Sequence, residues 1–242
     1  MTTFDKDYWE EFAINQKTIL DLNERLCNTT SEREKTEPKH LLKTSIGSFW
    51  KVLEEIKSID ISERPKQSTK EEHLNFLKTL AEHCQRYVDI EKKHLGVDGN
   101  EYGARVLQAS AYKTLWVRTC LKEGQLNFSG QDMRRVNLSG LSMREVNFSG
   151  SNMCGANFSR SDLSGANFSK TNLTESNFEG AKLIYVNFEG SGLSKANLLN
   201  TALNGANFES ANTNNALTDK SSLDTLFQPI NKGREEYTFR DL

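Results

Sequence analysis

Apolar residues near the start of the chain recur every three or four positions, which is the spacing of an amphipathic helix. Residues 8–26 and 38–59 both show this pattern, and in the second segment Ile46 and Phe49 fall on one helical face. Charged stretches separate these segments from the apolar runs that follow. We therefore expect residues 1–125 to form an antiparallel helical bundle.

The third predicted helix carries signals for both of its ends. Ser68 and Glu71 have the spacing of a capping box, in which each residue's side chain bonds the other's backbone N–H. Gly96 supplies a C-terminal stop, because glycine readily adopts the left-handed conformation that ends many helices. A fourth helix is expected from about Asn100 to Lys122.

From Leu126 onward the apolar pattern changes to a period of five residues. A large apolar residue occupies the centre of 17 consecutive repeats, from Phe128 to Phe208, and a mostly small residue lies two positions before each centre. A period of five leaves no apolar stripe on a helix and places alternate centres on opposite faces of a strand. The chain must therefore turn once per repeat and keep the centres inside. The predicted core residues include Phe128, Phe148, Phe158, Phe168, Phe178, Phe188, Phe208, Leu163, Leu173, Leu183, Leu193 and Leu203.

Longer periods within the repeats constrain how the chain coils. The centres at 20-residue intervals from Phe128 to Phe208 are all Phe, and the residue before every second centre is Asn. This spacing argues against a three-sided coil and leaves two-sided and four-sided coils open. Stacked coils would satisfy one another's backbone groups, and amides in register, such as Asn147 and Asn167, would form ladders.

The stretch "ANFSRSDLSGANFSKTNL" (156–173) resembles the pentapeptide-repeat family, and the resemblance extends over residues 126–212. It implies a right-handed, four-sided β-helix with four repeats per coil. The predicted fold class is then α+β and multi-domain, with a helical bundle domain at 1–125, a β-helix at 126–215 and a C-terminal tail at 216–242. The tail residues Leu223, Leu226 and Phe227 are expected to cover the last coil.

Composition narrows the classes of partner. The 242 residues carry a formal net charge of -2, which does not favour a nucleic-acid partner or an anionic membrane. No apolar run reaches the length of a membrane span, and the first residues show no secretory leader. We expect a cytoplasmic protein with reduced cysteines; delivery into a host cell as an effector is a variant that no sequence feature tests.

Catalytic and metal-binding motifs do not emerge from the sequence. His83 and His94 are 11 residues apart on one predicted helix, a separation of about 16 Å that is too long for a shared metal ion. Phosphate-binding loops, nucleophile elbows and zinc-protease motifs are missing from the sequence. Cys154 is expected to be a passive surface thiol. We therefore expect no enzyme activity, no cofactor and no catalytic or metal site.

Two departures from the small, polar outward residues mark a candidate protein-binding surface. One is the basic group Arg134, Arg135 and Arg144, for which a junction with the helical domain is the favoured interpretation. The other is Ile184 with Tyr185, which place apolar surface where other repeats have little. Packing against the tail and binding of a partner are both open for this pair.

The sequence as a whole favours a non-enzymatic scaffold or protein-protein interaction protein. A rigid repeat rod would present side chains, and the helical domain would engage a partner of unknown identity or form a homodimer. The resemblance supplies an alternative, a DNA-mimicking inhibitor or protector of a type II topoisomerase such as gyrase, as in the quinolone-resistance branch. Seven acidic residues against seven basic ones in 126–215 imitate DNA poorly.

Overall fold

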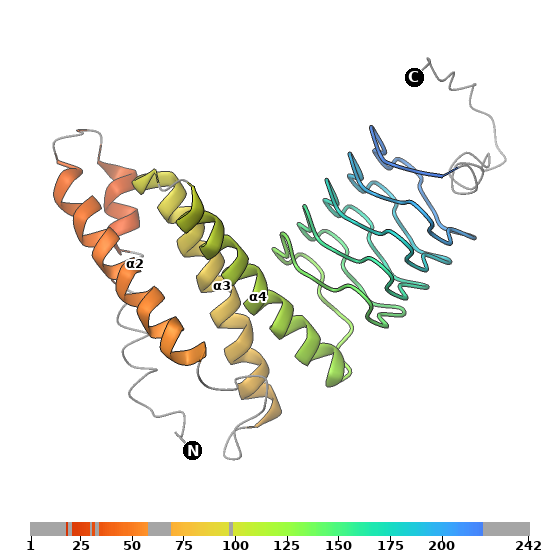
Figure 1. Ribbon diagram of the computed structural model, residues 1–242, viewed down its shortest axis with the longest axis horizontal. Helices are drawn as coiled ribbons and strands as arrows, with labels where there is room; N and C mark the ends of the chain where they lie inside the picture. Colours follow the sequence, from red (N-terminus) through yellow and green to blue (C-terminus); the bar gives the residue numbers. More distant parts are fainter. Residues whose placement is uncertain are drawn as a thin grey trace. The chain divides into compact units, whose positions relative to one another are not determined.

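The structure is a computed structural model that describes residues 18, 21–29, 31, 34–57, 69–96 and 99–219. Its named helices are α2 (Thr36–Lys57), α3 (Lys70–Leu95) and α4 (Asn100–Lys122), as Figure 1 shows. Residues 21–28 are also helical and extend the first predicted helix to Asn28. The start of that helix lies outside the described residues, as do the tail residues Leu223, Leu226 and Phe227.

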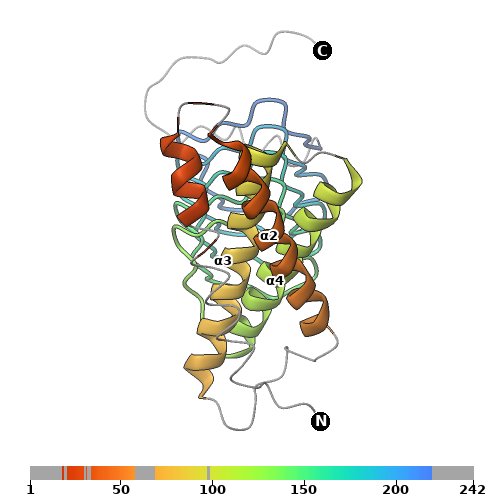
Figure 2. The ribbon, with the colours of Figure 1, turned by 90° about the vertical axis from the view of Figure 1, so that its left-hand side faces the viewer.

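The helices pack along their predicted apolar faces. α3 packs against both α2 and α4, and the three helices are drawn together in Figure 2. Ile46 and Phe49 of α2 are buried, and the Phe49 ring meets the Tyr87 ring of α3 edge-on at 4.5 Å between centroids. Leu107, within the predicted fourth helix, is 68% exposed, so the buried face of α4 runs through Tyr112 and Trp116 instead. Among the described helices, none is long and apolar enough to cross a membrane.

The N-terminus of α3 differs by one residue from the sequence prediction. The capping box is formed by Thr69 and Glu72: the Thr69 hydroxyl accepts from the Glu72 N–H at 3.1 Å, and the Glu72 carboxylate accepts from the Thr69 N–H at 2.7 Å. The prediction that Ser68 and Glu71 form this box is therefore wrong. At the other end Gly96 has a φ of 58°, the left-handed conformation expected of a C-cap.

The repeats form a stack of coils with 20 residues in each, visible as the green-to-blue loops of Figure 1. Isolated parallel bridges join residues 20 positions apart, beginning with Asn127 and Asn147. Within this ladder the Phe128 N–H donates to the Asn147 carbonyl at 2.7 Å. A two-sided coil would pair residues ten positions apart, so each coil contains four repeats.

Each repeat ends in a tight turn. In the turn after Leu183, the Val186 N–H donates back to the Leu183 carbonyl, and Tyr185 has a φ of 56°. The second residue after the centre has a positive φ throughout the described repeats, whether it is glycine or a residue with a side chain. A chain that turns once per repeat keeps every centre on the inside, which is the geometry that a period of five requires.

Phenylalanine rings form a continuous stack inside the coils. Phe168 is fully buried, with its ring centroid 5.3 Å from Phe148 and 5.5 Å from Phe188 in stacked geometry. The other predicted core residues are also buried, with one exception. Phe208 is only half-buried, because it lies in the last full coil that the structure describes and its stacked partner there is Phe188.

Most buried hydroxyls at the small positions of the described repeats bond to backbone carbonyls, although the Ser191 hydroxyl does not. Ser161 donates to the Phe158 carbonyl at 2.6 Å, and Ser176 donates to the Leu173 carbonyl at 2.7 Å. These bonds satisfy polar atoms that would otherwise be costly inside an apolar core. Serine and threonine are therefore compatible with inward positions next to the centres.

The chain divides into two compact units. The helical unit comprises Met1–Leu126 with Asp132–Asn137, and the coil unit comprises Asn127–Gln131 with Leu138–Leu242. One turn of the first coil therefore belongs to the helical unit. The domain limits 1–125, 126–215 and 216–242 stay a prediction from the sequence.

Candidate functional site

Three of the five candidate surface residues lie on one side of the coil unit. Arg144 follows the centre Met143, and Ile184 and Tyr185 follow the centre Leu183, 40 residues later in the sequence. With 20 residues per coil, these positions are two coils apart in one column. We call this column the Tyr185 face; its outward residues are Arg144, Glu145, Asp162, Ser164, Lys182, Ile184, Tyr185, Asn204 and Gly205.

Tyr185 is an exposed aromatic residue with a defined seat. Its side chain is 75% exposed, yet its ring lies directly over Gly205 of the next coil. A Cβ built on Gly205 would fall 2.4 Å from Cδ1 and 2.5 Å from Cε1 of Tyr185. Only glycine at position 205 therefore leaves room for the ring in this orientation. The 20-residue spacing of Tyr185 and Gly205 is a signal that the sequence prediction did not use.

On the Tyr185 face, Arg144 and Asp162 form an ion pair, and Ser164 hydrogen-bonds to the same carboxylate. Nε of Arg144 lies 3.2 Å from Oδ2 of Asp162, and the Ser164 hydroxyl donates to Oδ1 of Asp162 at 2.7 Å. The hydrogen bond from Ser164, with smaller effects from Arg144 and Lys182, lowers the pKa of Asp162 despite partial burial. Asp162 is therefore ionised at neutral pH and holds Arg144 in place.

Arg134 and Arg135 are separate from the Tyr185 face, because both belong to the helical unit. Arg134 forms ion pairs with Asp132 at 2.7 Å and with Asp89 of α3 at 2.8 Å. The backbone carbonyl of Arg135 accepts a hydrogen bond from Ser110 of α4. Within the helical unit, Arg134 and Arg135 thus join the repeat segment to α3 and α4.

A buried lysine that the sequence prediction missed completes this network. The Lys113 side chain is 3% exposed, and its Nζ lies 3.4 Å from Asp132 and 2.9 Å from Gln85. Burial lowers the pKa of Lys113, and the Asp132 charge partly opposes this effect. Burial alone would raise the pKa of Asp132, but hydrogen bonds from Arg134 and the charge of Lys113 lower it overall. Sequence spacing gives no signal for this contact, since a lysine in a helix is normally solvated.

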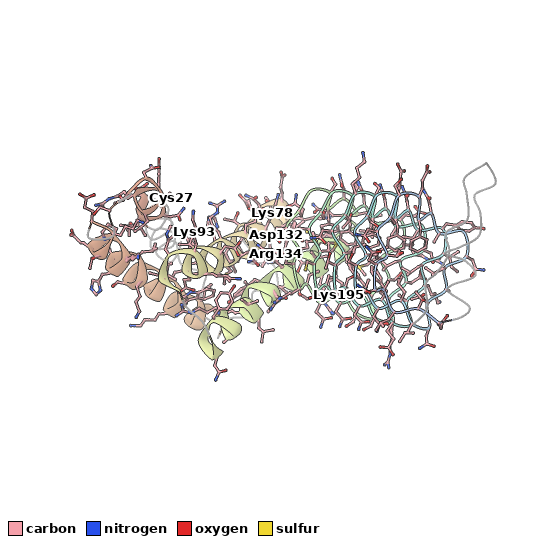
Figure 3. All side chains as sticks on the ribbon, turned by 90° about the horizontal axis from the view of Figure 1, so that it is seen from above. Cys27, Lys78, Lys93, Asp132, Arg134 and Lys195 are labelled. Carbon is pink, nitrogen blue, oxygen red and sulfur yellow. The ribbon has the colours of Figure 1, made fainter. Side chains whose placement is uncertain are left out.

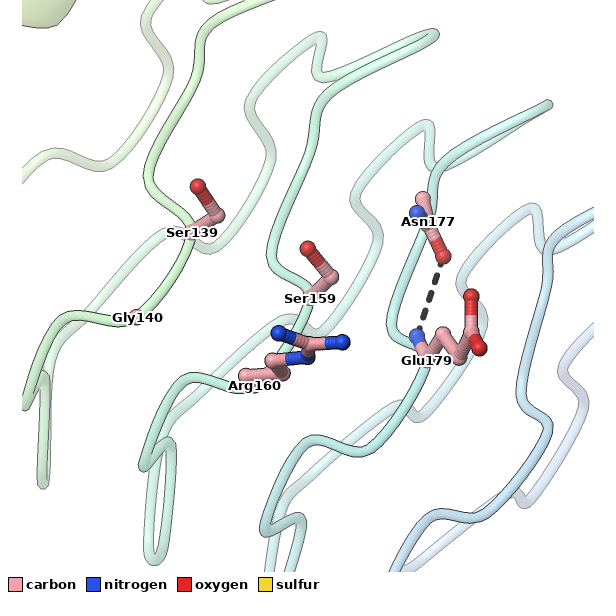
Figure 4. Close-up of a pocket in the computed structure, with 6 residues that line it drawn as sticks. All are labelled: Ser139, Gly140, Ser159, Arg160, Asn177 and Glu179. Atoms are coloured by element: carbon pink, nitrogen blue, oxygen red, sulfur yellow. Dashed lines mark hydrogen bonds between the residues drawn. The ribbon is translucent and has the colours of Figure 1, made fainter.

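A shallow polar groove lies on another side of the coil unit (Figure 4). Its volume is about 280 Å³, and its lining residues are Ser139, Gly140, Ser159, Arg160, Asn177 and Glu179. Gly140 has no side chain beside the long Arg160 side chain, which leaves the space open. The Asn177 side chain already accepts the Glu179 N–H at 3.0 Å, as the dashed line in Figure 4 marks. The groove is too open and polar to be a strong site on its own.

The geometry defines a repeat protein of stacked 20-residue coils, and the comparison with protein families agrees. The family model for pentapeptide repeats matches residues 125–209 in eight copies, in the overlapping segments 125–160, 142–180, 161–200 and 171–209. This part of the chain consists of pentapeptide repeats. The N-terminal helical region is not matched to a family.

Solved structures of other pentapeptide repeat proteins resemble parts of this chain. One is a pentapeptide repeat protein from the thylakoid lumen of Arabidopsis thaliana, with 27% identity, a TM-score of 0.32, and coverage of 39% of this chain and 72% of the other. Another is Rfr23 from the cyanobacterium Cyanothece 51142, with 29% identity, a TM-score of 0.21, and coverage of 35% and 61%. A third is QnrB1, a plasmid-mediated fluoroquinolone resistance protein, with 13% identity, a TM-score of 0.26, and coverage of 45% and 65%. A search of curated proteins found no match.

Proposed function

We propose that the protein is a non-enzymatic, protein-binding repeat protein whose coil unit is a right-handed, four-sided β-helix and whose anchor residue is Tyr185. The observation that supports this most directly is the 75% exposure of an aromatic ring that is nevertheless seated on Gly205. Large exposed side chains elsewhere on the described coils are mostly charged or polar. An aromatic residue at such a position contributes nothing to the core of the coils.

The position of the Tyr185 ring over Gly205 favours binding, because ordering a side chain at an interface costs conformational entropy. Ordering a mobile side chain at an interface costs roughly 0.5 to 1.5 kcal/mol, and a ring already held over Gly205 avoids much of that cost. Tyrosine is among the residues that most often dominate binding energy at protein interfaces. The Arg144 and Asp162 pair would supply a polar rim on the same face.

Photocrosslinking in cells of the source organism tests this proposal. A photoreactive phenylalanine analogue is placed at Tyr185 and, as a matched control, at Lys195. Lys195 occupies the same turn position with a φ of 59° and is also exposed, but it follows the centre of a different column. We expect a specific protein adduct at position 185 and none at 195. Equal adducts at both positions, or none at 185, would refute the binding role of Tyr185.

The same experiment separates the proposal from the topoisomerase alternative. DNA mimicry requires a surface dense in negative charge, whereas the Tyr185 face carries Arg144 and Lys182 beside Glu145 and Asp162. Crosslinking of a gyrase or topoisomerase IV subunit would favour the alternative.

We propose that the helical unit binds a second partner or a second copy of the chain, in the cytoplasm. Sedimentation of the full chain distinguishes these options, because a homodimer would double the mass.

A further inference from the structure

Charge and size alternate along the Tyr185 face from one coil to the next. A parallel bridge joins Asp162 to Lys182, so these residues lie side by side at the same position of neighbouring coils. The charge of Lys182 contributes to the lowered pKa of Asp162, which agrees with this short separation. At the turn position of the same two repeats, Gly165 is followed by Tyr185. An anion and a small residue in one coil are therefore followed by a cation and a large residue in the next.

This alternation makes the Tyr185 face complementary to itself. In a pair of copies that face each other with their coils stacked in opposite directions, a two-fold axis can run along the strands, midway between these two coils. Every position of one coil then lies opposite the equivalent position of the other coil. Asp162 meets Lys182 of the second copy, and Lys182 meets Asp162 of the second copy. Each carboxylate would then lie between two lysines, which is a favourable arrangement of charge at an interface.

The same arrangement brings large side chains opposite small ones. Tyr185 would lie opposite Gly165 of the second copy. Ile184 would likewise lie opposite Ser164. The side chain of Glu145 crosses Gly165, since a Cβ built on that glycine would fall 3.3 Å from Cγ of Glu145. The tyrosine ring would therefore contact the methylene groups of this glutamate, and no second bulky residue competes with it at the turn of that coil.

Another side of the coil unit has the same alternation of charge but no aromatic residue. Glu175 and Lys195, the second of which is labelled in Figure 3, occupy the turn position of consecutive coils and form an ion pair at 3.4 Å. Among the described residues of the coil unit, the large apolar side chains that are exposed are Tyr185 and Leu217, and neither belongs to this column. Glu175 and Lys195 thus provide a control that has the charges without the aromatic anchor.

We propose that the protein bound by the Tyr185 face is a second copy of this chain, packed with its coils in the opposite direction. This inference rests on the proposed function, because it names the partner of the same face. The face extends about 20 Å along the stack, at about 4.8 Å per coil. Such a face is smaller than the interface of a stable dimer, so the two copies should associate weakly and in proportion to their concentration.

Photocrosslinking of the purified full chain tests this pairing. The photoreactive phenylalanine analogue is placed at Tyr185, and equal amounts of unlabelled and nitrogen-15-labelled protein are mixed at high micromolar concentration. We expect adducts that join position 185 to the segment of Ser164 and Gly165, and that combine one labelled with one unlabelled peptide. No adduct, an adduct within a single chain, or an adduct to a different segment of the second copy would overturn the proposal.

Charge variants that carry the same analogue test the orientation of the two copies. Lys182→Glu makes both charge pairs repulsive and should lower the adduct yield about tenfold, which the loss of two exposed ion pairs can supply. Asp162→Asn removes the attraction and should lower the yield less. A mixture of these two variants restores one pair, between Lys182 of one copy and Asp162 of the other, and should crosslink better than either variant alone. The control Lys195→Glu should leave the yield unchanged. A mixture without recovery, or an equal effect of Lys195→Glu, would overturn the proposal.

Failure of this inference is distinguishable from failure of the proposed function. An adduct between position 185 and a different protein in cells, with none in the purified chain, would overturn the second copy as partner and would retain the binding role of Tyr185. The absence of an adduct at 185 both in cells and in the purified chain would refute both.

Discussion

Replacing Phe168 with alanine tests whether the Phe stack holds the coil unit together. Phe168 is fully buried, and its ring contacts four others: Phe148 and Phe188 in stacked geometry, and Phe158 and Phe178 edge-on at 5.4 and 5.8 Å. Removing a buried Phe side chain costs about 3 to 5 kcal/mol, from lost burial and from the cavity left behind. The four aromatic contacts place the expected loss of unfolding free energy at the upper end of this range.

Phe208→Ala is the matched control, because it is the same substitution at the same position of a repeat. Phe208 is half-buried and stacks on Phe188 with a centroid distance of 5.0 Å. Partial exposure and a single stacked ring place the expected loss for Phe208→Ala at about 2 to 3 kcal/mol. The two substitutions should therefore differ by about 1 to 3 kcal/mol if the ring stack is the main contribution.

Urea unfolding followed by circular dichroism measures both losses, and hydrogen exchange locates them. Repeat proteins can unfold in parts, so amide protection in the coils next to each substitution gives the local effect directly. We expect Phe168→Ala to weaken protection in the coils on both sides. Similar losses for the two variants would show that burial inside the coils does not control stability, and the inward assignment of the centres would then be wrong.

Two further predictions concern the Tyr185 seat and the buried lysine. Gly205→Ala and Gly180→Ala both place alanine at positive φ, at a cost of about 1 to 2 kcal/mol, but a Cβ at 180 meets only ordinary contacts. Gly205→Ala should lower the free energy of unfolding in urea by about 1 kcal/mol more than Gly180→Ala, and it should abolish the crosslinked adduct at position 185. Equal behaviour of the two variants would show that Gly205 does not position the ring at 185. Asp132→Asn leaves the Lys113 charge without its carboxylate and should lower stability at pH 7 by about 1 to 3 kcal/mol, less than for a fully buried pair because Asp132 is 40% exposed. The pKa of Asp132 is lowered in the folded state, so its contribution to the free energy of unfolding is present above about pH 4 and is lost as the pH falls further. A stability difference between wild type and Asp132→Asn that persisted in acid would exclude this explanation.

The inward register of the repeats was predictable because one physical requirement dominates it. A large apolar residue every five positions must be buried, and a single turn per repeat buries all of them. The number of repeats per coil was harder to predict from the sequence. Phe at 20-residue intervals argued against three repeats per coil but left two and four open, and the bridge between Asn127 and Asn147 then removed the two-sided alternative.

The N-terminus of α3 shows where local sequence signals are ambiguous. Ser68 with Glu71 and Thr69 with Glu72 both fit the capping-box pattern, since the sequence places two hydroxyl residues before two glutamates. The two choices differ only in where the first turn begins, and the residues from Lys70 onward lie on the same faces in both, so the apolar pattern does not discriminate between them. Lys70, the first residue of α3, pairs with Glu123 at 3.0 Å, a tertiary contact that the local motif does not encode.

The candidate surface was predictable only in part. Arg144, Ile184 and Tyr185 lie in one column, which follows from a 20-residue coil. Arg134 also follows a centre directly, but it belongs to the helical unit, where it forms an ion pair with Asp89 of α3. Which side chains of a helix meet a given turn depends on the helix's rotation and position, and the sequence does not state either.

The asparagine before every second centre has a role beyond the expected ladders. Ladder bonds do occur, as between Asn147 and Asn127 at 3.1 Å. A bond to the turn recurs more widely: the side-chain oxygen accepts the N–H two residues later, as Asn177 does from Glu179 at 3.0 Å. This bond stabilises the turn that every repeat needs, and it explains Asn on sides of the coil where ladder bonds are fewer.

Aspartate at the equivalent position keeps the turn bond and adds a charge. Asp132 accepts the Arg134 N–H and Asp162 accepts the Ser164 N–H, each at 3.2 Å. The second oxygen of each carboxylate then pairs with an arginine, Arg134 in one case and Arg144 in the other. An asparagine at these positions would preserve the turn but would remove the carboxylate that pairs with Arg144 and leave Arg134 with Asp89 of α3. Aspartate at this position of a repeat therefore combines the turn bond with an ion pair to a basic side chain.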